Sequence, residues 1–289
     1  MASYTFRIET EHEGFTIKDY LRKAAGISSR QLKKLKCAPG GILVNGLHAI
    51  VTDRLSSGDE LAINSPEEAV SYDFSPTEPD IVYENENYIV VNKPSNMTVY
   101  LCGNVRENLL SSVCGYYAAK GISLKFRPFY RLDKDTSGLV LLAKNALIMN
   151  STVIVKEYFA VCEGKVPEKG FVCAPISLSP GSRIRRRADG DGEYALTNFE
   201  RAAFDGVNSL VKLKLETGRT HQIRVHMSHI GYPLCGDDLY GGSMDIIPRQ
   251  ALHCGKLSVS SELTGFTAGF DSDFPEDMKK AFPKLCGKA

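Results

Sequence analysis

Apolar residues recur in short runs along the chain, and their spacing predicts short helices and strands. In the first 65 residues, Thr16 with Asp19 and Ser28 with Gln31 have the spacing of a capping box, which opens a helix. A tight Asn-Gly turn joins two apolar runs further on, as in a hairpin. The elements predicted for this part are helices over 17–25 and 29–36, a hairpin over 42–51 and a strand over 60–63.

The pattern changes at 64–79, a segment with three prolines, four acidic residues and little periodicity. This composition is typical of a linker between folded units. The sequence therefore predicts a small N-terminal domain over 1–65, a linker over 66–79 and a larger domain over 80–289.

Strand patterns dominate the larger part of the chain, where β-branched, aromatic and alternating apolar residues are frequent. The periodicity of 221–230 fits a strand or a helix equally well. The other predicted elements are a helix over 107–120 and strands over 80–84, 88–92, 139–143, 158–162, 194–199 and 210–215. Together they predict an α+β fold with a large, mainly antiparallel sheet and few long helices.

Composition narrows the class of protein. The 289 residues are 43% hydrophobic and 24% charged with a net charge of +1, which excludes a disordered tail protein and a global attraction to polyanions. No apolar run approaches the roughly 18–20 residues that span a bilayer, and the start of the chain lacks a secretory pattern. The eight cysteines form no CxxC pair, which favours free thiols in a reducing compartment. We expect a cytoplasmic protein without a membrane partner, and nothing in the sequence requires more than a monomer.

Positive charge gathers locally, since residues 18–36 hold seven basic side chains against one acid. A solvated helix face is one interpretation, and phosphate binding is the other. The order of helix, helix, hairpin and strand resembles the S4 RNA-binding module over about 14–63, although 37–39 interrupt the usual path into the hairpin. The resemblance implies contacts with structured RNA, for which the candidate residues are Arg22, Lys23, Arg30, Lys33 and Lys34.

Two polar clusters are candidates for chemistry. Residues 131–138 are turn-forming and lead into a buried strand, which is a common setting for catalytic groups and also an ordinary turn. Residues 217–226 hold two arginines and two histidines among apolar residues. Because an arginine is costly to bury beside an apolar sheet unless it meets an anion, this cluster needs an anionic partner, and Asp133 is a candidate.

A zinc site is a rival interpretation of the histidines and cysteines near the C-terminal end. The possible ligands are His221, His226, His229, Cys235, His253 and Cys254. The spacing of the first three histidines matches no common zinc motif, and no carboxylate lies among them. We therefore expect no metal and place these histidines in the core or facing RNA.

Three stretches closely resemble the signature motifs of the RluA-type RNA pseudouridine synthases. They are RLDKDTSGLVLLAKN, KEYFAVCEG and TGRTHQIRVHMSHIGYPLCGDDLYG. Residues 81–97, 249–253 and 274–282 agree as well, and an S4 module in front is a frequent arrangement in this family. The resemblance implies a pseudouridine-synthase-like catalytic domain that isomerises uridine in RNA. Substrate and product have the same formula, so it implies no cofactor.

The same resemblance implies roles for individual residues. Asp133 is the essential carboxylate, Arg219 pairs with it and keeps it ionised and aimed, and Tyr158 packs on the target base and helps to remove the C5 proton. The target nucleotide is expected to be flipped out, because no pocket reaches a base inside a duplex. Phosphate contacts are expected from Arg131, Lys156 and Arg224, with the arginine run over 183–187 as either a further contact or a solvated loop.

Two departures of the chain from the family pattern bear on the catalytic domain, and a third, Ser260-Ser261 where a His-Pro is common, is taken to be neutral. Tyr130 stands where a histidine usually precedes Arg-Leu-Asp, and activity should survive with a different hydrogen-bond arrangement. Only eleven residues separate Lys144 from Lys156, where the family commonly has a longer helical stretch. Ribosomal RNA is favoured over transfer RNA as the substrate. A non-catalytic RNA-binding protein of the same fold is the alternative, and the intact catalytic set argues against it.

Overall fold

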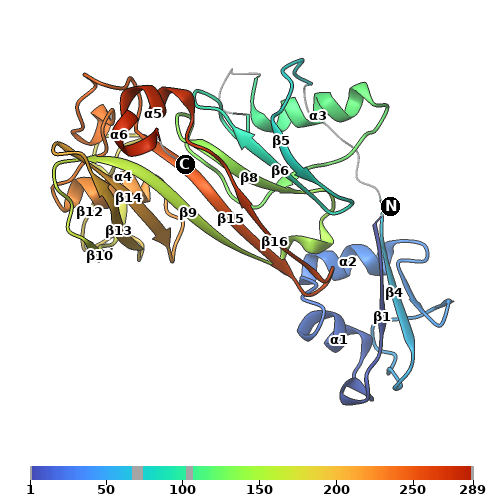
Figure 1. Ribbon diagram of the computed structural model, residues 1–289. Helices are drawn as coiled ribbons and strands as arrows, with labels where there is room; N and C mark the ends of the chain where they lie inside the picture. Colours follow the sequence, from blue (N-terminus) through green and yellow to red (C-terminus); the bar gives the residue numbers. More distant parts are fainter. Residues whose placement is uncertain (1, 67–73, 102–106, 288–289) are drawn as a thin grey trace.

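The computed structural model describes residues 2–66, 74–101 and 107–287 (Figure 1). A small N-terminal unit lies at one end of a larger unit built on a long, curved sheet. Half of the predicted linker, 67–73, lies outside the described residues. Within the described part of the chain, no helix is long and apolar enough to cross a bilayer.

The N-terminal unit packs two helices against an antiparallel sheet with the strand order β1-β4-β2-β3. Its elements are β1 (Ala2–Arg7), α1 (Ile17–Lys23), α2 (Ser29–Cys37), β2 (Ile42–Val44), β3 (Leu47–His48) and β4 (Glu60–Ser65). Thr16 Oγ1 accepts the N–H of Asp19 at 3.1 Å, and Ser28 and Gln31 form the full reciprocal capping box. Both predicted helices are therefore confirmed.

The predicted hairpin is also confirmed, but its second strand ends at His48. Asn45 and Gly46 both have positive φ, at 52° and 79°, as the tight Asn-Gly turn requires. The sequence pattern did not predict β1, which pairs along its whole length with β4. This pairing joins the two ends of the unit in sequence, so no local signal announces it.

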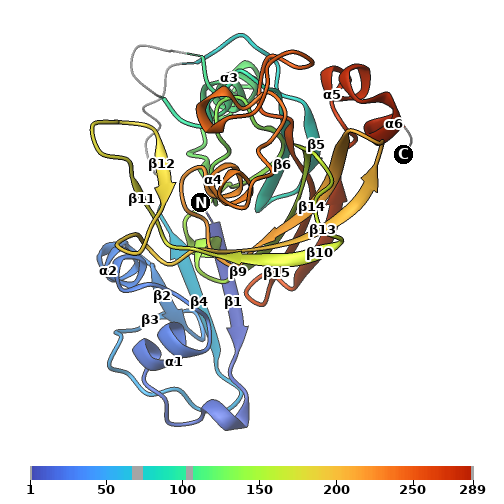
Figure 2. The same ribbon diagram turned by 90° about the vertical axis from the view of Figure 1, so that its left-hand side faces the viewer.

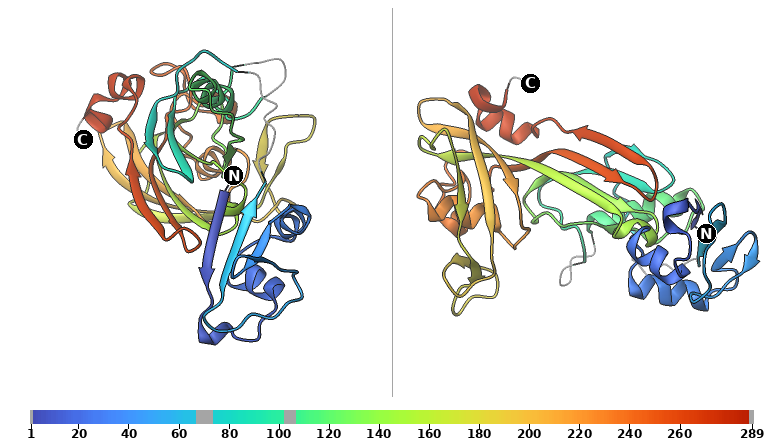
Figure 3. Two further views of the ribbon diagram at one scale, coloured as in Figure 1. Left: turned by 90° about the vertical axis from the view of Figure 1, so that its right-hand side faces the viewer. Right: turned by 90° about the horizontal axis from the view of Figure 1, so that it is seen from below.

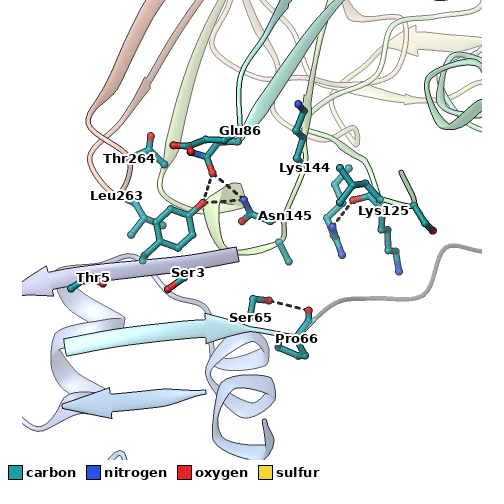
Figure 4. A pocket seen from close by; sticks show the side chains of 16 residues that line it. Ser3, Thr5, Ser65, Pro66, Glu86, Lys125, Lys144, Asn145, Leu263 and Thr264 are labelled. Atoms are coloured by element: carbon teal, nitrogen blue, oxygen red, sulfur yellow. Dashed lines mark hydrogen bonds between the residues drawn. The ribbon is translucent and has the colours of Figure 1, made fainter. Parts of the chain in front are cut away.

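Side chains fix the N-terminal unit to the larger one. Gln31 Nε2 donates to the carbonyl oxygens of Ala146 and Leu147, and the Leu147 side chain joins the apolar core of the N-terminal unit. Asn145 Nδ2 donates to the Tyr4 hydroxyl at 2.9 Å. Figure 4 shows Asn145 at the cavity of about 570 Å³ that lies between the two units. The shortened stretch after Lys144 is thus where the N-terminal unit docks.

The larger unit is built on a sheet with the strand order β10-β13-β14-β9-β15-β8-β6-β5, with β16 beside β15 and β7 beside β8. Its strands are β5 (Ile81–Glu84), β6 (Tyr88–Lys93), β7 (Arg127–Pro128), β8 (Ser137–Ala143), β9 (Thr152–Glu163), β10 (Lys169–Cys173), β13 (Leu196–Phe204), β14 (Asn208–Leu215), β15 (Leu252–Ser261) and β16 (Phe266–Asp271). Among the described residues, β15 and β8 are the one parallel pair of neighbours. The predicted α+β class with a mainly antiparallel sheet is confirmed.

Helices cover both faces of this sheet. They are α3 (Leu109–Ala119), α4 (Gln222–His229), α5 (Glu276–Ala281) and α6 (Pro283–Cys286). Side chains of β9 point to the two faces of the sheet. Tyr158 and Cys162 pack on the face covered by α3 and α4, and Val161 packs on the face covered by α5 and α6. The undecided segment 221–230 is therefore a helix, and it covers the same face as Tyr158.

A separate hairpin of β11 (Ile176–Leu178) and β12 (Arg186–Ala188) projects from the sheet (Figure 2). It carries the arginine run over 183–187. Figure 3 shows that this hairpin and the N-terminal unit extend to the same side of the sheet. The two projections thus flank one face of the larger unit.

Candidate active site

The loop that carries Asp133 is fixed at the middle of the sheet. It leads into β8, whose Gly138 has a φ of +116° and lies against Cys254 of β15. A Cβ at this position would come within 2.3 Å of the Cys254 carbonyl oxygen, so only glycine allows the parallel strands to approach. The fully buried ammonium group of Lys93 donates to the carbonyl oxygens of Pro94, Met97 and Lys134. Because Lys134 follows Asp133, this bond holds the loop in place.

The arginine that faces Asp133 is Arg224. Its Nη1 lies 3.5 Å from Asp133 Oδ2, while its Nε and Nη2 each donate to a carboxylate oxygen of Asp237 at 2.7 Å. Arg224 is 8% exposed and Asp237 is 1% exposed. A buried guanidinium is stable when paired and hydrogen-bonded in this way. Because its donors point at protein carboxylates, the structure does not support the expectation that Arg224 contacts an RNA phosphate, which stays a prediction.

Arg219 does not pair with Asp133, so that sequence-based assignment is wrong. Arg219 Nη1 lies 2.7 Å from Glu193 Oε2, and its Nε donates to the Tyr194 carbonyl oxygen at 3.1 Å. The physical reason is the start of α4. Arg219 lies in the turn before the helix, whereas Arg224 lies within the helix and faces inward. Arg219 lines the edge of the same cavity.

Tyr158 lies on β9 and lines a cavity of about 60 Å³. Asp133, Arg219, His221 and Arg224 line this cavity together with it. Tyr158 is 5% exposed, and burial raises the pKa of its phenol well above the usual value. The structure thus brings the predicted carboxylate and the predicted tyrosine to one place.

Lys156 lies behind Tyr158 and not at the cavity mouth. Its Nζ is 4.2 Å from the centroid of the Tyr130 ring and 5.9 Å from that of Tyr158. Burial lowers the pKa of Lys156. Tyr130, which the family resemblance aligns with a histidine, donates its hydroxyl to the Leu139 carbonyl oxygen at 2.9 Å. The Lys156 side chain thus packs on the rings of both tyrosines.

A wider cavity of about 610 Å³ opens in front of Asp133. Arg131 is exposed at its wall, and its contact with a phosphate stays a prediction. Ile184, between β11 and β12, lines the same cavity and is 63% exposed. The arginine run over 183–187 therefore lies beside the site, with 183–185 in the loop between β11 and β12 and the last two arginines in β12.

The basic residues predicted to bind RNA in the N-terminal unit are exposed; they are Arg22, Lys23, Arg30, Lys33 and Lys34. Arg22 also donates to the Ile27 carbonyl oxygen, and Lys23 lies 3.3 Å from Asp19. Arg30 and Lys34 line a cavity of about 370 Å³ together with Lys125 and Arg127 of the larger unit. Positive side chains from both units thus face one hollow.

Within the described ranges, the candidate zinc ligands do not converge into a group of three or more. His226 bonds to Thr197 Oγ1 and to the Ala174 carbonyl oxygen, and His253 Nδ1 bonds to Ser137 Oγ. These two histidines therefore serve as hydrogen-bonding groups of the core.

Comparisons with known proteins identify the family. Residues 87–229 match the family described as RNA pseudouridylate synthase. The chain is 38% identical over 276 residues to the uncharacterized RNA pseudouridine synthase YjbO of Bacillus subtilis (strain 168), covering 92% of this chain and 97% of that protein. It is 34% identical to the ribosomal large subunit pseudouridine synthase D of Escherichia coli O157:H7, covering 82% of this chain and 80% of that one. The chain belongs to the RluA-type family of RNA pseudouridine synthases.

The solved structures show the same fold. Human RNA pseudouridylate synthase domain containing 1 aligns with a TM-score of 0.56 at 25% identity, covering 70% of this chain and 86% of that one. Human RNA pseudouridylate synthase domain containing 4 aligns with a TM-score of 0.57 at 21% identity, covering 71% of this chain and 92% of that one. As an RNA pseudouridine synthase, the protein is an isomerase.

Two residues at the site were not assigned from the sequence with their observed partners. From the sequence, Arg224 is expected on an RNA phosphate, and His221 is expected at a metal, in the core or facing RNA. Helical spacing alone contains no signal for these partners, because His221 precedes α4 in a left-handed conformation and the pattern does not mark where the helix begins. His221 Nε2 lies 3.8 Å from Asp133 Oδ2.

Proposed function

We propose that this pseudouridine synthase isomerises uridine in structured RNA without a cofactor and that turnover depends on Asp133. The observation that carries the proposal is the convergence of Asp133, Arg224 and Tyr158 on one small cavity. A carboxylate, a guanidinium held by a second carboxylate, and an aromatic ring suffice for the chemistry of this reaction.

The difficult step is cleavage of the bond between ribose C1′ and uracil N1. The bonding electrons leave with the base as a uracil anion, and the sugar becomes electron-poor at C1′. The Asp133 carboxylate stabilises this charge, acts as a nucleophile, or removes a neighbouring proton. The base then turns, C5 bonds to C1′, and the C5 proton is lost while N1 gains one, so that the formula is unchanged.

Arg224 takes the role that the family resemblance gave to Arg219. Its contact with Asp133 Oδ2 is 3.5 Å long, and Asp237 fixes its guanidinium from the other side. We propose that Arg224 aims Asp133 and offsets its negative charge in a site that closes over the substrate.

Tyr158 is proposed to pack against the target base. Because burial raises the pKa of its phenol well above the usual value, the side chain is neutral at physiological pH. A neutral ring suits packing on uracil, and its hydroxyl is proposed to help to remove the C5 proton.

RNA binding is proposed to involve both units. The target nucleotide is flipped out of its helix into the cavity, as is general for enzymes that act on bases. Arg131 contacts a flanking phosphate at the cavity wall. Residues 1–65 act as an S4-like module whose exposed basic side chains contact a more distant part of the same RNA.

Ribosomal RNA is the proposed substrate class, with transfer RNA as the second candidate. The support is the relative named ribosomal large subunit pseudouridine synthase D, together with the basic N-terminal unit. We propose that the enzyme acts in the cytoplasm as a monomer.

Release of tritium tests the proposal, because the reaction replaces the hydrogen on uracil C5. Ribosomal and transfer RNA labelled with tritium at this position are treated separately with the wild type, D133N and the matched loop variant D135N. We expect release from ribosomal RNA with the wild type and D135N and none with D133N, while D133N still binds RNA. Turnover by D133N would overturn the assignment of Asp133.

A further inference from the structure

His221 has an unusual backbone conformation at the start of α4. Its φ of 58° and ψ of 19° lie in the left-handed region, which is uncommon for a residue with a side chain. Its side chain makes no capping bond to the helix, so helix capping does not explain the conformation. Such strain is often retained where it places a functional group. Here the imidazole lies between Asp133 and Tyr240.

Hydrogen bonds determine which nitrogen of His221 carries the proton. The Tyr240 hydroxyl oxygen accepts the backbone N–H of Arg186 at 2.9 Å and lies 2.8 Å from His221 Nδ1. A phenol has one proton to donate, and among the described residues His221 Nδ1 is the acceptor that its hydroxyl reaches. Tyr240 therefore donates to Nδ1, and a neutral imidazole carries its proton on Nε2, the nitrogen that faces Asp133.

The surroundings favour the neutral imidazole. The side chain is 15% exposed, and burial lowers the pKa of His221 below its ordinary 6.5. The charged groups around it are Asp133, Arg224, Asp237 and Arg186. The two carboxylates oppose the shift and the two arginines assist it. The Tyr240 ring also packs edge-on to the imidazole, at 5.7 Å between centroids.

We propose that His221 is a positioning residue for pseudouridine formation, holding Asp133 Oδ2 through its Nε2–H, with Tyr240 fixing the required tautomer. The inference rests on the proposed role of Asp133. The distance of 3.8 Å is long for a hydrogen bond, and contacts of this kind tighten when substrate closes the site.

The same contacts orient the carboxylate. Both His221 and Arg224 approach Oδ2 of Asp133, which leaves Oδ1 to face the sugar. Since Tyr240 is bonded to Arg186 of β12, the same contacts connect the arginine-bearing hairpin to the carboxylate.

Three variants separate this role from a structural one. H221Q keeps an N–H donor close to the position of Nε2, H221L removes it, and Y240F removes the donor to Nδ1. H229Q on the exposed side of the same helix is the matched control. The readouts are kcat and KM for tritium release from labelled RNA between pH 5 and 8, with thermal unfolding to verify folding.

We expect kcat of H221L to fall about tenfold or more with KM unchanged. A loss of this size corresponds to the free energy of a hydrogen bond to a charged group. H221Q should recover kcat to within about threefold of the wild type. Wild-type kcat should fall on acidification, because protonated Nδ1 no longer accepts the Tyr240 hydrogen bond that orients the ring, although Nε2 keeps its proton. H221Q should lack this fall. In Y240F the neutral imidazole of His221 loses the hydrogen bond from the Tyr240 hydroxyl and is less favoured. The fall in kcat should therefore begin at a higher pH.

The outcomes distinguish this inference from the proposed function. Wild-type kcat in H221L, or an H221Q variant as impaired as H221L, would overturn the role of His221 while inactive D133N upheld that of Asp133. An unmoved pH profile in Y240F would overturn the role of Tyr240 in fixing the tautomer. Turnover by D133N would overturn both proposals, since His221 would then have no catalytic carboxylate to position.

Discussion

Asp133 Oδ2 and Arg224 Nη1 lie 3.5 Å apart, and this contact defines the charged centre of the site. Arg219 pairs with Glu193 instead. Arg224 is shared between two carboxylates, of which Asp237 is almost completely buried and Asp133 faces the cavity. The arrangement separates two tasks. Asp237 anchors the arginine, and the arginine aims the carboxylate that is proposed to meet the substrate.

Replacing Arg224 by methionine should therefore damage both activity and folding. We expect kcat to fall by about 10²-fold or more, as when a preorganised donor is removed from an active site. The free energy of unfolding should fall by about 3–5 kcal/mol, because Asp237 would be left buried and unpaired. Turnover assays and urea denaturation measure the two effects.

Arg219→Met is the matched control for this prediction. The pair of Arg219 with Glu193 is exposed, with side-chain exposures of 38% and 72%, so its loss should cost less than about 1 kcal/mol. An inactive R219M together with an active R224M would restore the sequence-based assignment and contradict the geometry.

The contrast between these two arginines separates features that local sequence predicts from features that depend on long-range contacts. Capping spacings, the Asn-Gly turn and apolar runs predicted α1, α2, the β2–β3 hairpin and most strands of the large sheet, because each depends on neighbours in sequence. The partner of Asp133 depends on where α4 begins, and the left-handed conformation of His221 sets that point. Periodicity could not determine it. The pairing of β1 with β4 and the docking of Gln31 on Ala146 are likewise long-range contacts without a local pattern.

Replacing Gly138 by alanine should destabilise the protein and disturb the catalytic loop. A Cβ there would meet three backbone atoms of Cys254 at 2.3–2.8 Å, and the φ of +116° is itself unfavourable for alanine. We expect a loss of about 1–3 kcal/mol in the free energy of unfolding, the range seen when packed structure is overfilled. Gly190→Ala, at a glycine with open space around it, is the control and should unfold like the wild type. Equal melting temperatures for both variants would contradict the argument.

Lys93 should make stability depend on pH. Burial lowers the pKa of its ammonium group from 10.5 to about 7. Between these values the unfolded chain binds a proton that the folded protein does not, so stability rises with pH across this window, by at most about 1.4 kcal/mol per unit. K93M abolishes this titration. The difference in the free energy of unfolding between wild type and K93M should therefore move in favour of the wild type from pH 7 to 9.5.

Denaturant titrations at several pH values check this prediction. K134M, which removes an exposed lysine next to Asp133, is the control and should follow the pH dependence of the wild type. A difference between wild type and K93M that stays constant with pH would show that Lys93 keeps its charge in the folded protein.

The N-terminal unit should contribute to RNA affinity and not to the chemical step. Arg30 and Lys34 face the hollow shared with Lys125 and Arg127, on a unit whose contacts with the larger one are fixed by Gln31 and Tyr4. The double variant R30A/K34A should raise KM for RNA about tenfold and leave kcat unchanged. If both side chains contact phosphates, the slope of log K against log salt should become shallower by about 0.7–0.9 for each.

K284A is the control, because it removes one exposed positive charge from α6 at the far end of the sheet (Figure 1). It should leave KM and the salt slope unaltered. A drop in kcat at saturating RNA, or an unchanged salt slope, would mean that these residues act through the fold of the module and not through the phosphate backbone.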